Sequence, residues 1–568
     1  MPPRPAPRAH AAGNAAPVAA APRRAPGWLR PVVAVLAAAL AIGLLSRPFA
    51  DTDSWWHLKT GQYIAENHKL PVPDPFSITT ARNAPGTPGE ARMRYFNLTH
   101  EWLAQVAGYA VYRAGGFGGV VLLRVLLLCG FSVLAGLTVH HRGAGFYGSV
   151  AAALAASSAM PFVAADRPQV VTYLFLALTV YLLETRRHLW VLAPMFLVWA
   201  NAHGGFVIGW VAMGAYCAES LVLRWRGRPV AGERSLWMAA GAAVAASALN
   251  PNGLRIVQVL ADYGQSPLQS TLIEWQRTNY WEISPFNGLL YGALGTLIWV
   301  RGKARLVDWL LFGMFAVAAL NAARNCFLVA LVGPVIVVSY FPWKRALPVA
   351  AEYGVALLLV VGVAWKCTSP LAYQFRADER DLPKGAAEFV LAHHITGPMF
   401  NTYVEGGYLI WKLWPQCRVF TDGRALSEAA YEQAGRIQAN AAAEGGKSAE
   451  QLLKDYGIET ILMNGFEFFS GTAYYLPAAL SDPVQKEWKL VFQDSNATVF
   501  MRHPPAGVEP LDSLSALTSM ENQCEAHMRV CPWENGCTRE LGKLFAVIGD
   551  PVRAQKWAVR WAEVSGKP

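Results

Sequence analysis

Charged residues are scarce in this chain of 568 residues. Asp, Glu, Lys and Arg make up 15% of it, whereas 54% is hydrophobic, and this balance excludes an ordinary soluble protein. Residues 1–30 contain no acid at all and are rich in Pro, Ala and Arg, so they bury too little apolar surface to fold. We expect them to form a disordered cytoplasmic tail.

The first apolar run lacks the small-residue cleavage site of a signal peptide and continues into "LLSRPFADTD", so we expect it to remain as a membrane anchor. A bilayer requires apolar runs of about 20 residues. Runs near this length lie at 31–49, 117–139, 145–163, 168–185, 189–202, 205–223, 235–250, 286–300, 307–322, 325–342 and 347–366. They predict a polytopic α-helical membrane protein with about 11 spans and a transmembrane domain over residues 31–367.

Basic residues predict the orientation of these spans, because cytoplasmic connections carry an excess of Lys and Arg. With a cytoplasmic N-terminus, the inside connections hold Arg142, Arg186, Arg187, Arg224, Arg226, Arg228, Arg234, Arg301, Lys303, Arg305, Lys344 and Arg345. The short outside connections hold Arg167, Arg255, Arg277 and Arg324. This bias places the loop 50–116 and everything after residue 367 in the periplasm of a bacterial inner-membrane protein. It also accounts for the net charge of +10 without nucleic acid as a partner.

The composition changes after the last apolar run. "GPMFNTYVEGGYLIWKL" predicts a strand, a glycine turn and a helix, "CRVFTDGRA" a strand with a polar tip, "SAEQLLKDYGIETILMNG" a helix and a strand, and "WKLVFQDSNATVFMRH" a hairpin. Strands that alternate with helices predict a periplasmic α/β domain over residues 370–503. Residues 510–568 show no strand pattern and predict a C-terminal helical segment.

Three of the eight cysteines, Cys524, Cys531 and Cys537, cluster in this last segment. An oxidising compartment would permit a disulfide among them. A zinc site that includes His527 is the alternative, although the spacing matches no familiar ligand pattern.

The outside ends of the spans repeatedly carry polar residues that a passive anchor would not need. The first outside loop contains "DTDSWWHLK", with Asp51, Asp53, Trp55, Trp56 and His57, and "HEW", with Glu101. Later connections contribute Asp166 and Arg167, Asn201 and His203, Asn250 and Asn252, and Arg324 and Asn325. Polar residues at a membrane face are costly unless they line a hydrated cavity, so their convergence predicts a functional site.

Each of these residues also has a structural explanation. Asp51 and Asp53 could cap a helix or lie in a solvated loop, and Asp166 could simply pair with Arg167 or another arginine. His203 could be a packing residue, and Asn250 and Asn252 could be turn residues. The two tryptophans and Arg324 could anchor the chain at the membrane interface.

Taken together, the acidic pair after the first span, the long first outside loop, the acid between the third and fourth spans and the soluble outside domain resemble the C-type glycosyltransferases (GT-C) of membranes. That group includes aminoarabinose transferases, protein mannosyltransferases and oligosaccharyltransferase catalytic subunits. "DTDSWWHLKTGQYI", "LPVPDPFS" and "HEWLAQ" are also similar to segments of uncharacterised bacterial membrane proteins near this group, and "EGGYLIWKLWPQCRVFTDGRA" resembles their outer domain. The resemblance covers most of residues 31–503.

The resemblance implies an enzyme that moves a sugar from a polyprenyl-phosphate carrier to a glycan, lipid or protein acceptor at the outer membrane face. It implies that Asp53 or Asp51 is the catalytic acid, and that Asp166 corresponds to the acid of the second outside loop. The chain departs from the group in having about 11 spans rather than more, and "YVEGGY" stands where oligosaccharyltransferases carry two tryptophans before Asp-Tyr-Gly. Transfer to protein asparagine is therefore not expected.

Such a reaction needs a base for the acceptor and cations for the leaving phosphate. Asp53 is the favoured base, and Arg167, Arg324 or Arg255 could hold the phosphate, as could a divalent cation (Mg or Mn) between Asp53 and Asp166. Further predicted substrate-binding residues are His57, Trp55, Trp56, Glu101 and His203, together with Glu405, Tyr408, Asp422 and Arg424 of the outer domain. For the outer domain, the alternative is that Gly406 and Gly407 only form a tight turn.

Two other classes of protein remain open. A transporter would place its polar groups near the middle of the membrane, often in an internal repeat, whereas this chain shows no repeat and its acids lie at one face. A non-catalytic membrane scaffold with a partner-binding outer domain would need neither the acids nor the arginines in short connections.

Overall fold

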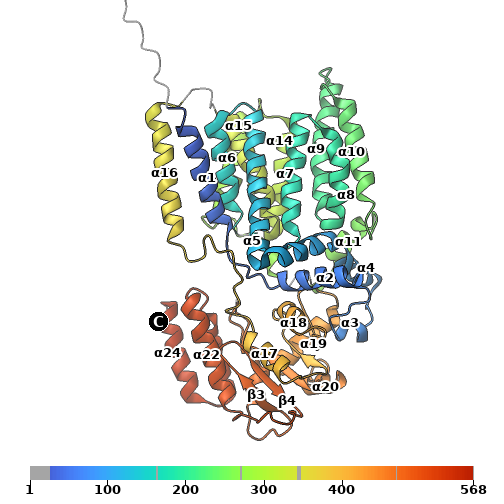
Figure 1. Cartoon of the computed structure of the whole chain (residues 1–568), viewed down its shortest axis with the longest axis vertical. Coiled ribbons are helices and arrows are strands. Elements are labelled where there is room, and N and C mark those ends of the chain that lie inside the picture. The colour runs from blue at the N-terminus through green and yellow to red at the C-terminus, as the bar shows by residue number, and fades with distance from the viewer. Residues whose placement is uncertain (1–25, 162–163, 269–271, 342–346, 469, 567–568) are drawn as a thin grey trace, which may run out of the picture.

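The computed structural model describes residues 26–161, 164–268, 272–341, 347–468 and 470–566, so residues 1–25 of the predicted tail lie outside the described residues. The described chain forms a helical bundle with a smaller unit, built around a sheet, at one end (Figure 1). We call that end of the bundle the near end and the opposite end the far end.

Each of the eleven predicted apolar runs coincides with a helix of the bundle. The helices are α1 (Leu29–Leu45), the second half of α5 (Trp102–His141), α6 (Gly145–Ala159), α7 (Gln169–Thr185), α8 (Leu192–Ala202), α9 (Phe206–Trp225), α10 (Glu233–Ser247), α13 (Pro285–Val300), α14 (Leu306–Asn321), α15 (Cys326–Tyr340) and α16 (Val349–Cys367). By length and composition, four helical segments of the described chain could cross a membrane, and several others are apolar but shorter. The number of membrane crossings therefore stays a prediction.

The predicted first outside loop, residues 50–116, folds against the near end of the bundle. It forms α2 (Ser54–Asn67), α3 (Thr79–Arg82), α4 (Pro88–Thr99) and the first half of α5, and α2 and the first half of α5 lie across the ends of the bundle helices (Figure 1). Gly116 separates the halves of α5 with φ 59° and ψ −157°, a conformation that essentially only glycine adopts. This turn redirects the chain from the face of the bundle into its interior.

The sheet unit contains four strands, β1 (Met399–Phe400), β2 (Thr460–Met463), β3 (Lys489–Gln493) and β4 (Thr498–Met501), in the order β1-β2-β4-β3. β1 runs parallel to β2 with Phe400 opposite Ile461, and the other pairs are antiparallel. The helices α17 (Lys384–Ala392), α18 (Gly406–Leu413), α19 (Glu428–Gln438), α20 (Ala449–Asp455) and α21 (Tyr475–Leu480) accompany the sheet. A mixed α/β unit is thus present, as predicted.

One predicted strand of this unit is wrong. In "CRVFTDGRA" only Val419 pairs with another strand-like segment, through a single parallel bridge to Ser77 of the first outside loop. Phe420 is fully buried in the core of the sheet unit, which explains the hydrophobic pattern. The segment therefore runs between the loop and the sheet unit instead of joining the sheet.

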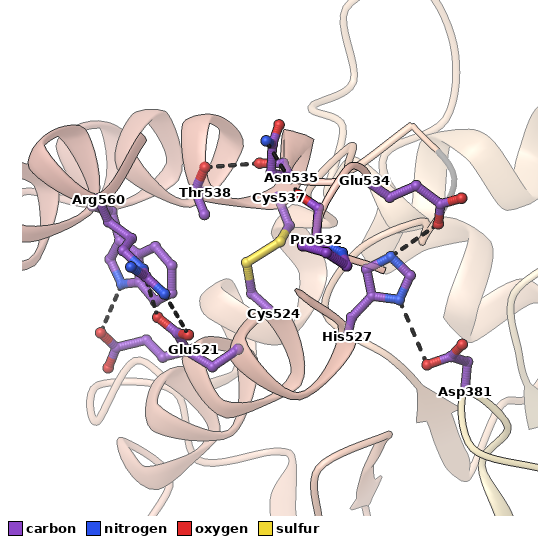
Figure 2. Close-up of a disulfide and its surroundings, with 12 residues drawn as sticks. Asp381, Glu521, Cys524, His527, Pro532, Glu534, Asn535, Cys537, Thr538 and Arg560 are labelled. Atoms are coloured by element: carbon purple, nitrogen blue, oxygen red, sulfur yellow. Dashed lines mark hydrogen bonds and ion pairs between the residues drawn. A yellow bond between two sulfur atoms is a disulfide. The ribbon is translucent and has the colours of Figure 1, made fainter. Parts of the chain in front are cut away.

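The C-terminal segment forms the predicted helices, α22 (Ser515–Val530), α23 (Gly536–Val547) and α24 (Pro551–Ser565). A disulfide joins Cys524 of α22 to Cys537 of α23 (Figure 2). Cys531 remains a free thiol. The alternative prediction of a zinc site finds no support, because the described residues contain no group of three His, Cys, Asp or Glu side chains that could hold a metal ion.

His527 lies beside this disulfide and bridges two parts of the chain (Figure 2). Its side chain is 2% exposed; Nδ1 lies 3.5 Å from Asp381, in the connection from α16 to α17, and Nε2 lies 3.2 Å from Glu534. Burial lowers the pKa of His527, but the two carboxylates outweigh it, so the net pKa is raised. When it is protonated, the ring links the C-terminal helices to the connection that enters the sheet unit.

We expect this contact to make stability depend on pH. A raised folded-state pKa gives stability that is complete below the ordinary histidine pKa of about 6.5 and is lost as pH rises through the folded value. The loss should be about 1 kcal/mol, because both carboxylates are partly exposed. Melting temperatures measured from about pH 5.5 to 8.5 should fall more for the wild type than for His527→Gln. Parallel curves for the two proteins would contradict the prediction.

A second buried ionic network ties the helices together at the far end. Arg142, after α5, pairs with Glu184 of α7 and Asp308 of α14, each at 2.9 Å. Arg305, before α14, pairs with Glu184 and with Glu219 of α9. Arg142 and Arg305 belong to the set that predicts the cytoplasmic side. Both pair with protein carboxylates from other helices, so we interpret them as links within the bundle.

Candidate active site at the near end of the bundle

The acidic pair Asp51 and Asp53 lies at the start of α2, but its two members have different surroundings. Asp51 Oδ1 accepts hydrogen bonds from the backbone N–H groups of Asp53 at 3.0 Å and Ser54 at 3.2 Å. It thereby caps the first turn of the helix. Asp53 accepts a single side-chain hydrogen bond on Oδ1, from Trp56 Nε1 at 3.1 Å. Helix capping thus explains Asp51 but not Asp53.

Arg167 joins this pair to two other connections of the bundle. Its Nε lies 2.8 Å from Asp51 Oδ1, and its Nη1 lies 2.9 Å from Asp53 Oδ2 and 3.1 Å from Glu274 Oε2. Glu274 in turn pairs with Arg324 at 3.0 Å, and the guanidinium of Arg324 lies over the ring of Trp275. Three predicted site residues, Asp53, Arg167 and Arg324, therefore belong to one chain of alternating charges.

The two acids of the pair differ in pKa. Burial raises the pKa of Asp51, but the ion pair with Arg167 and its backbone hydrogen bonds reverse this, so the net pKa is lowered. Burial raises the pKa of Asp53 to about 6 despite Arg167, because Asp51 and Glu274 add repulsion. Asp53 is thus the member of the pair with a proton affinity near that of a working general base.

We predicted that Asp166 shares the charge environment of Asp53, but the two acids pair with different arginines. It pairs with Arg124 of α5, which also donates a hydrogen bond to the backbone carbonyl of Arg47. Burial raises the pKa of Asp166 to about 7, and Asp51 is the neighbouring carboxylate that adds to this shift. Asp166 is therefore neutralised by Arg124 and not by Arg167, the arginine that pairs with Asp53.

The predicted divalent cation does not fit this arrangement. Asp53 and Asp166 are neutralised by different arginines, Arg167 and Arg124, and the described residues contain no group of three side chains that could hold a metal ion. A need for Mg or Mn stays a prediction, and we assign the cation no step in the reaction.

Glu101 lies at the centre of three histidines. His57 Nδ1 is 3.5 Å from its carboxylate, His100 Nε2 is 3.2 Å away and His203 Nε2 is 3.6 Å away. Burial raises the pKa of Glu101, but its interactions with the histidines, that with His100 foremost, outweigh burial and lower the pKa. Burial lowers the pKa of His57 to about 4 and of His203 to about 3. We call these four residues the histidine cluster.

The histidine cluster is adjacent to the acidic pair. The ring of His57 packs on Trp56, with centroids 3.6 Å apart, and Trp56 donates to Asp53. Glu101, His57 and His203 were predicted, whereas His100 and Glu274 were missed. His100 directly precedes Glu101 in "HEW", so its position next to a predicted site residue could have indicated it. Glu274 lies in a predicted outside connection whose Lys and Arg residues were counted but whose acid was not considered.

Other predicted substrate-binding residues serve the contact between the first outside loop and the sheet unit. Trp55 is fully buried and packs on Tyr408, whose hydroxyl donates to Glu379. Arg424 pairs with Asp422 of its own segment and with Asp74 of the loop, at 2.7 and 2.6 Å. These four side chains are buried in protein contacts and bring the sheet unit onto the loop.

Glu405 is buried and forms no ion pair with any described residue. Its Oε2 accepts from the Thr402 hydroxyl at 2.9 Å, and burial raises its pKa to about 8. It precedes α18, and the two glycines that follow it lie against the backbone of Thr421 and of Thr52. The hypothesis that residues 405–408 and 422–424 cover the site agrees with these contacts, whereas a role in holding the acceptor stays a prediction.

We expect Gly407→Ala to loosen this cover. A Cβ at Gly407 would overlap the carbonyl oxygen of Thr52, next to Asp53, and would crowd Trp56. Overpacking of this kind costs about 1–3 kcal/mol, so the melting temperature and any transfer activity should fall. Gly435→Ala is the matched control, because no atom lies within 4 Å of its Cβ position in α19. Equal effects of the two substitutions would contradict the close approach.

No family model matches the chain, and a search among curated proteins finds no match. Solved structures do align with it. The archaeal oligosaccharyltransferase AglB from Archaeoglobus fulgidus, in complex with an inhibitory peptide and a dolichol-phosphate, aligns with a TM-score of 0.53 and 11% identity over 88% of this chain and 77% of its own. Apo ArnT from Cupriavidus metallidurans aligns with a TM-score of 0.47 and 13% identity over 84% of this chain and 98% of its own. The alignment with AglB confirms the predicted resemblance at the level of the fold.

Proposed function

We propose that this chain is a membrane glycosyltransferase that moves a sugar from a polyprenyl-phosphate carrier to an acceptor at the periplasmic face of a bacterial inner membrane. Asp53 carries the proposal. It is a largely buried carboxylate with a raised pKa at the near end of a helical bundle, and it pairs with Arg167, which is linked to Arg324 through Glu274. The fold shared with an oligosaccharyltransferase supports the same reaction class.

Asp53 acts as the base. Its carboxylate takes the proton of the acceptor hydroxyl or amine, the acceptor oxygen or nitrogen forms a bond with the anomeric carbon of the sugar, and the bond from that carbon to the phosphate oxygen breaks. The electron pair of the broken bond leaves with the polyprenyl phosphate. Desolvation suits Asp53 to this role, because it raises the proton affinity of the carboxylate.

Arg324 is the arginine best placed for the leaving phosphate. It forms a single ion pair within the described chain, with Glu274, and its side chain is 27% exposed. Arg167 is engaged by three carboxylates, so it positions Asp53 instead of binding substrate. A guanidinium presents several N–H groups in one plane, which matches phosphate geometry.

The experiment is transfer by the purified protein in liposomes that contain polyprenyl-phosphate sugars, with labelled sugar followed into added lipid, glycan and peptide acceptors. We expect the wild-type protein to transfer the sugar and the Asp53→Asn protein to lose this activity. Solute flux without transfer would favour the transporter alternative, although the acids here gather at one end of the bundle instead of mid-membrane. If neither transfer nor flux is observed, the non-catalytic scaffold becomes the better explanation.

The proposal includes a topology, which predicts the location of the C-terminus. The loop 50–116 and the sheet unit lie at the same end of the bundle (Figure 1), and the arginine bias places the far end in the cytoplasm. A phosphatase that is active only after export should be active when it is fused after Pro568. A fluorescent protein that folds only in the cytoplasm should not fluoresce when it is fused at the same position. The reverse pattern would contradict the orientation.

A further inference from the structure

Arg47 and Lys366 are two cations at the near end of the bundle that have no acidic partner among the described residues. Arg47 follows α1, and Lys366 is the penultimate residue of α16. Within the described ranges neither forms an ion pair, and the recorded contact of the Lys366 ammonium is with the ring of Trp365. The aliphatic part of Lys366 packs on α1, because a Cβ at Gly43 would lie 2.9 Å from its Cγ.

A third cation lies next to them. Arg124 donates one guanidinium N–H to Asp166 and another to the backbone carbonyl of Arg47. Of these three cations, only Arg124 forms an ion pair within the described residues, with Asp166, so the group attracts an anion.

The flank of α16 between these cations and the far end of the bundle is apolar and open. α16 lies beside α1 at the edge of the bundle (Figure 1). Its exposed side chains include Leu357, Leu358, Val361 and Trp365, the last 67% exposed. A tryptophan at the end of such a helix suits the boundary between hydrocarbon and headgroups. A ligand for this surface therefore needs an anionic head and apolar tails.

We propose that Arg47 and Lys366 bind the phosphate of an anionic phospholipid whose acyl chains lie along α16. Lys366 by itself could be explained by a lysine that extends towards water at the end of a membrane helix. That explanation does not account for Arg47, whose backbone carbonyl accepts a hydrogen bond from a third cation, Arg124. The open position on the flank favours a bilayer phospholipid over the polyprenyl-phosphate donor, which has to reach Asp53. The inference does not depend on the proposed glycosyltransferase activity.

Full-length protein in nanodiscs tests the proposal, with lipid retention by native mass spectrometry and melting temperature as readouts. One basic residue near an anionic lipid surface strengthens attraction about fivefold. Arg47→Gln with Lys366→Gln should therefore weaken retention of phosphatidylglycerol about 25-fold and remove most of the rise in melting temperature over phosphatidylcholine discs. Arg47→Lys with Lys366→Arg should keep both.

Arg277→Gln is the matched control, because Arg277 is an exposed cation in another outside connection. It should retain the lipid preference, and an equal loss in this control would overturn a specific site. Stabilisation by inorganic phosphate in phosphatidylcholine discs, or by polyprenyl phosphate but not phosphatidylglycerol, would also overturn it. If the glutamine double variant fails to fold, unchanged lipid retention by each single variant would be the overturning result.

Discussion

Asp53→Asn should lower the rate of sugar transfer by about 100-fold to 10,000-fold, the usual effect of losing one positioned general base. The substitution keeps the size of the side chain and its hydrogen bond from Trp56, so the protein should remain folded. The wild-type rate should rise with pH through about 6, the pKa of Asp53, because only the deprotonated carboxylate accepts a proton. The measurement is initial rate against pH with a polyprenyl-linked sugar.

Two matched substitutions separate chemistry from structure. Asp51→Ala removes the acceptor for two backbone N–H groups at the start of α2, so it should lower the melting temperature more than Asp53→Asn does. Glu66→Gln changes an exposed acid near the other end of α2 and should leave the rate unchanged. A fully active Asp53→Asn protein would remove Asp53 from the mechanism.

The bundle could be predicted from the sequence because each helix is a local apolar run. All eleven runs coincide with helices, and the hairpin at residues 489–501 also follows from its local pattern. The strand predicted around Val419 was wrong because its hydrophobic residues contact the loop at Ser77 and the core of the sheet unit instead of pairing with a strand of the sheet. Its partner, Ser77, lies more than 300 residues earlier in the chain.

The sequence predicted which acidic and basic residues belong to the site, but not which acid forms an ion pair with which arginine. Asp51, Asp53 and Arg167 meet as expected, whereas Asp166 pairs with Arg124, a residue inside an apolar run that was read only as a membrane span. The buried ion pair of Asp74 with Arg424 likewise crosses 350 positions. Sequence periodicity records which residues are buried, and it does not record which long-range partner neutralises each charge.

Arg167→Gln should have the second large effect, because it removes the cation shared by three carboxylates. Asp51, Asp53 and Glu274 would face one another without Arg167. Breaking a buried ion pair by removing one partner costs about 3–5 kcal/mol, and the melting temperature should fall accordingly. The substitution should also raise the pKa of Asp53, because Arg167 is the main group that lowers it.

The direction of the pH shift distinguishes this positioning role from a merely structural one. Removal of a neighbouring opposite charge raises a carboxylate pKa by about 1–3 units, so the rate against pH should move to higher pH by at least about one unit. Arg167→Lys keeps the charge but cannot reproduce the forked contacts with Asp51 and Asp53, so its profile should stay near that of the wild type at a reduced rate. An unshifted profile for Arg167→Gln, with only stability lost, would mean that Arg167 supports the fold and does not tune Asp53.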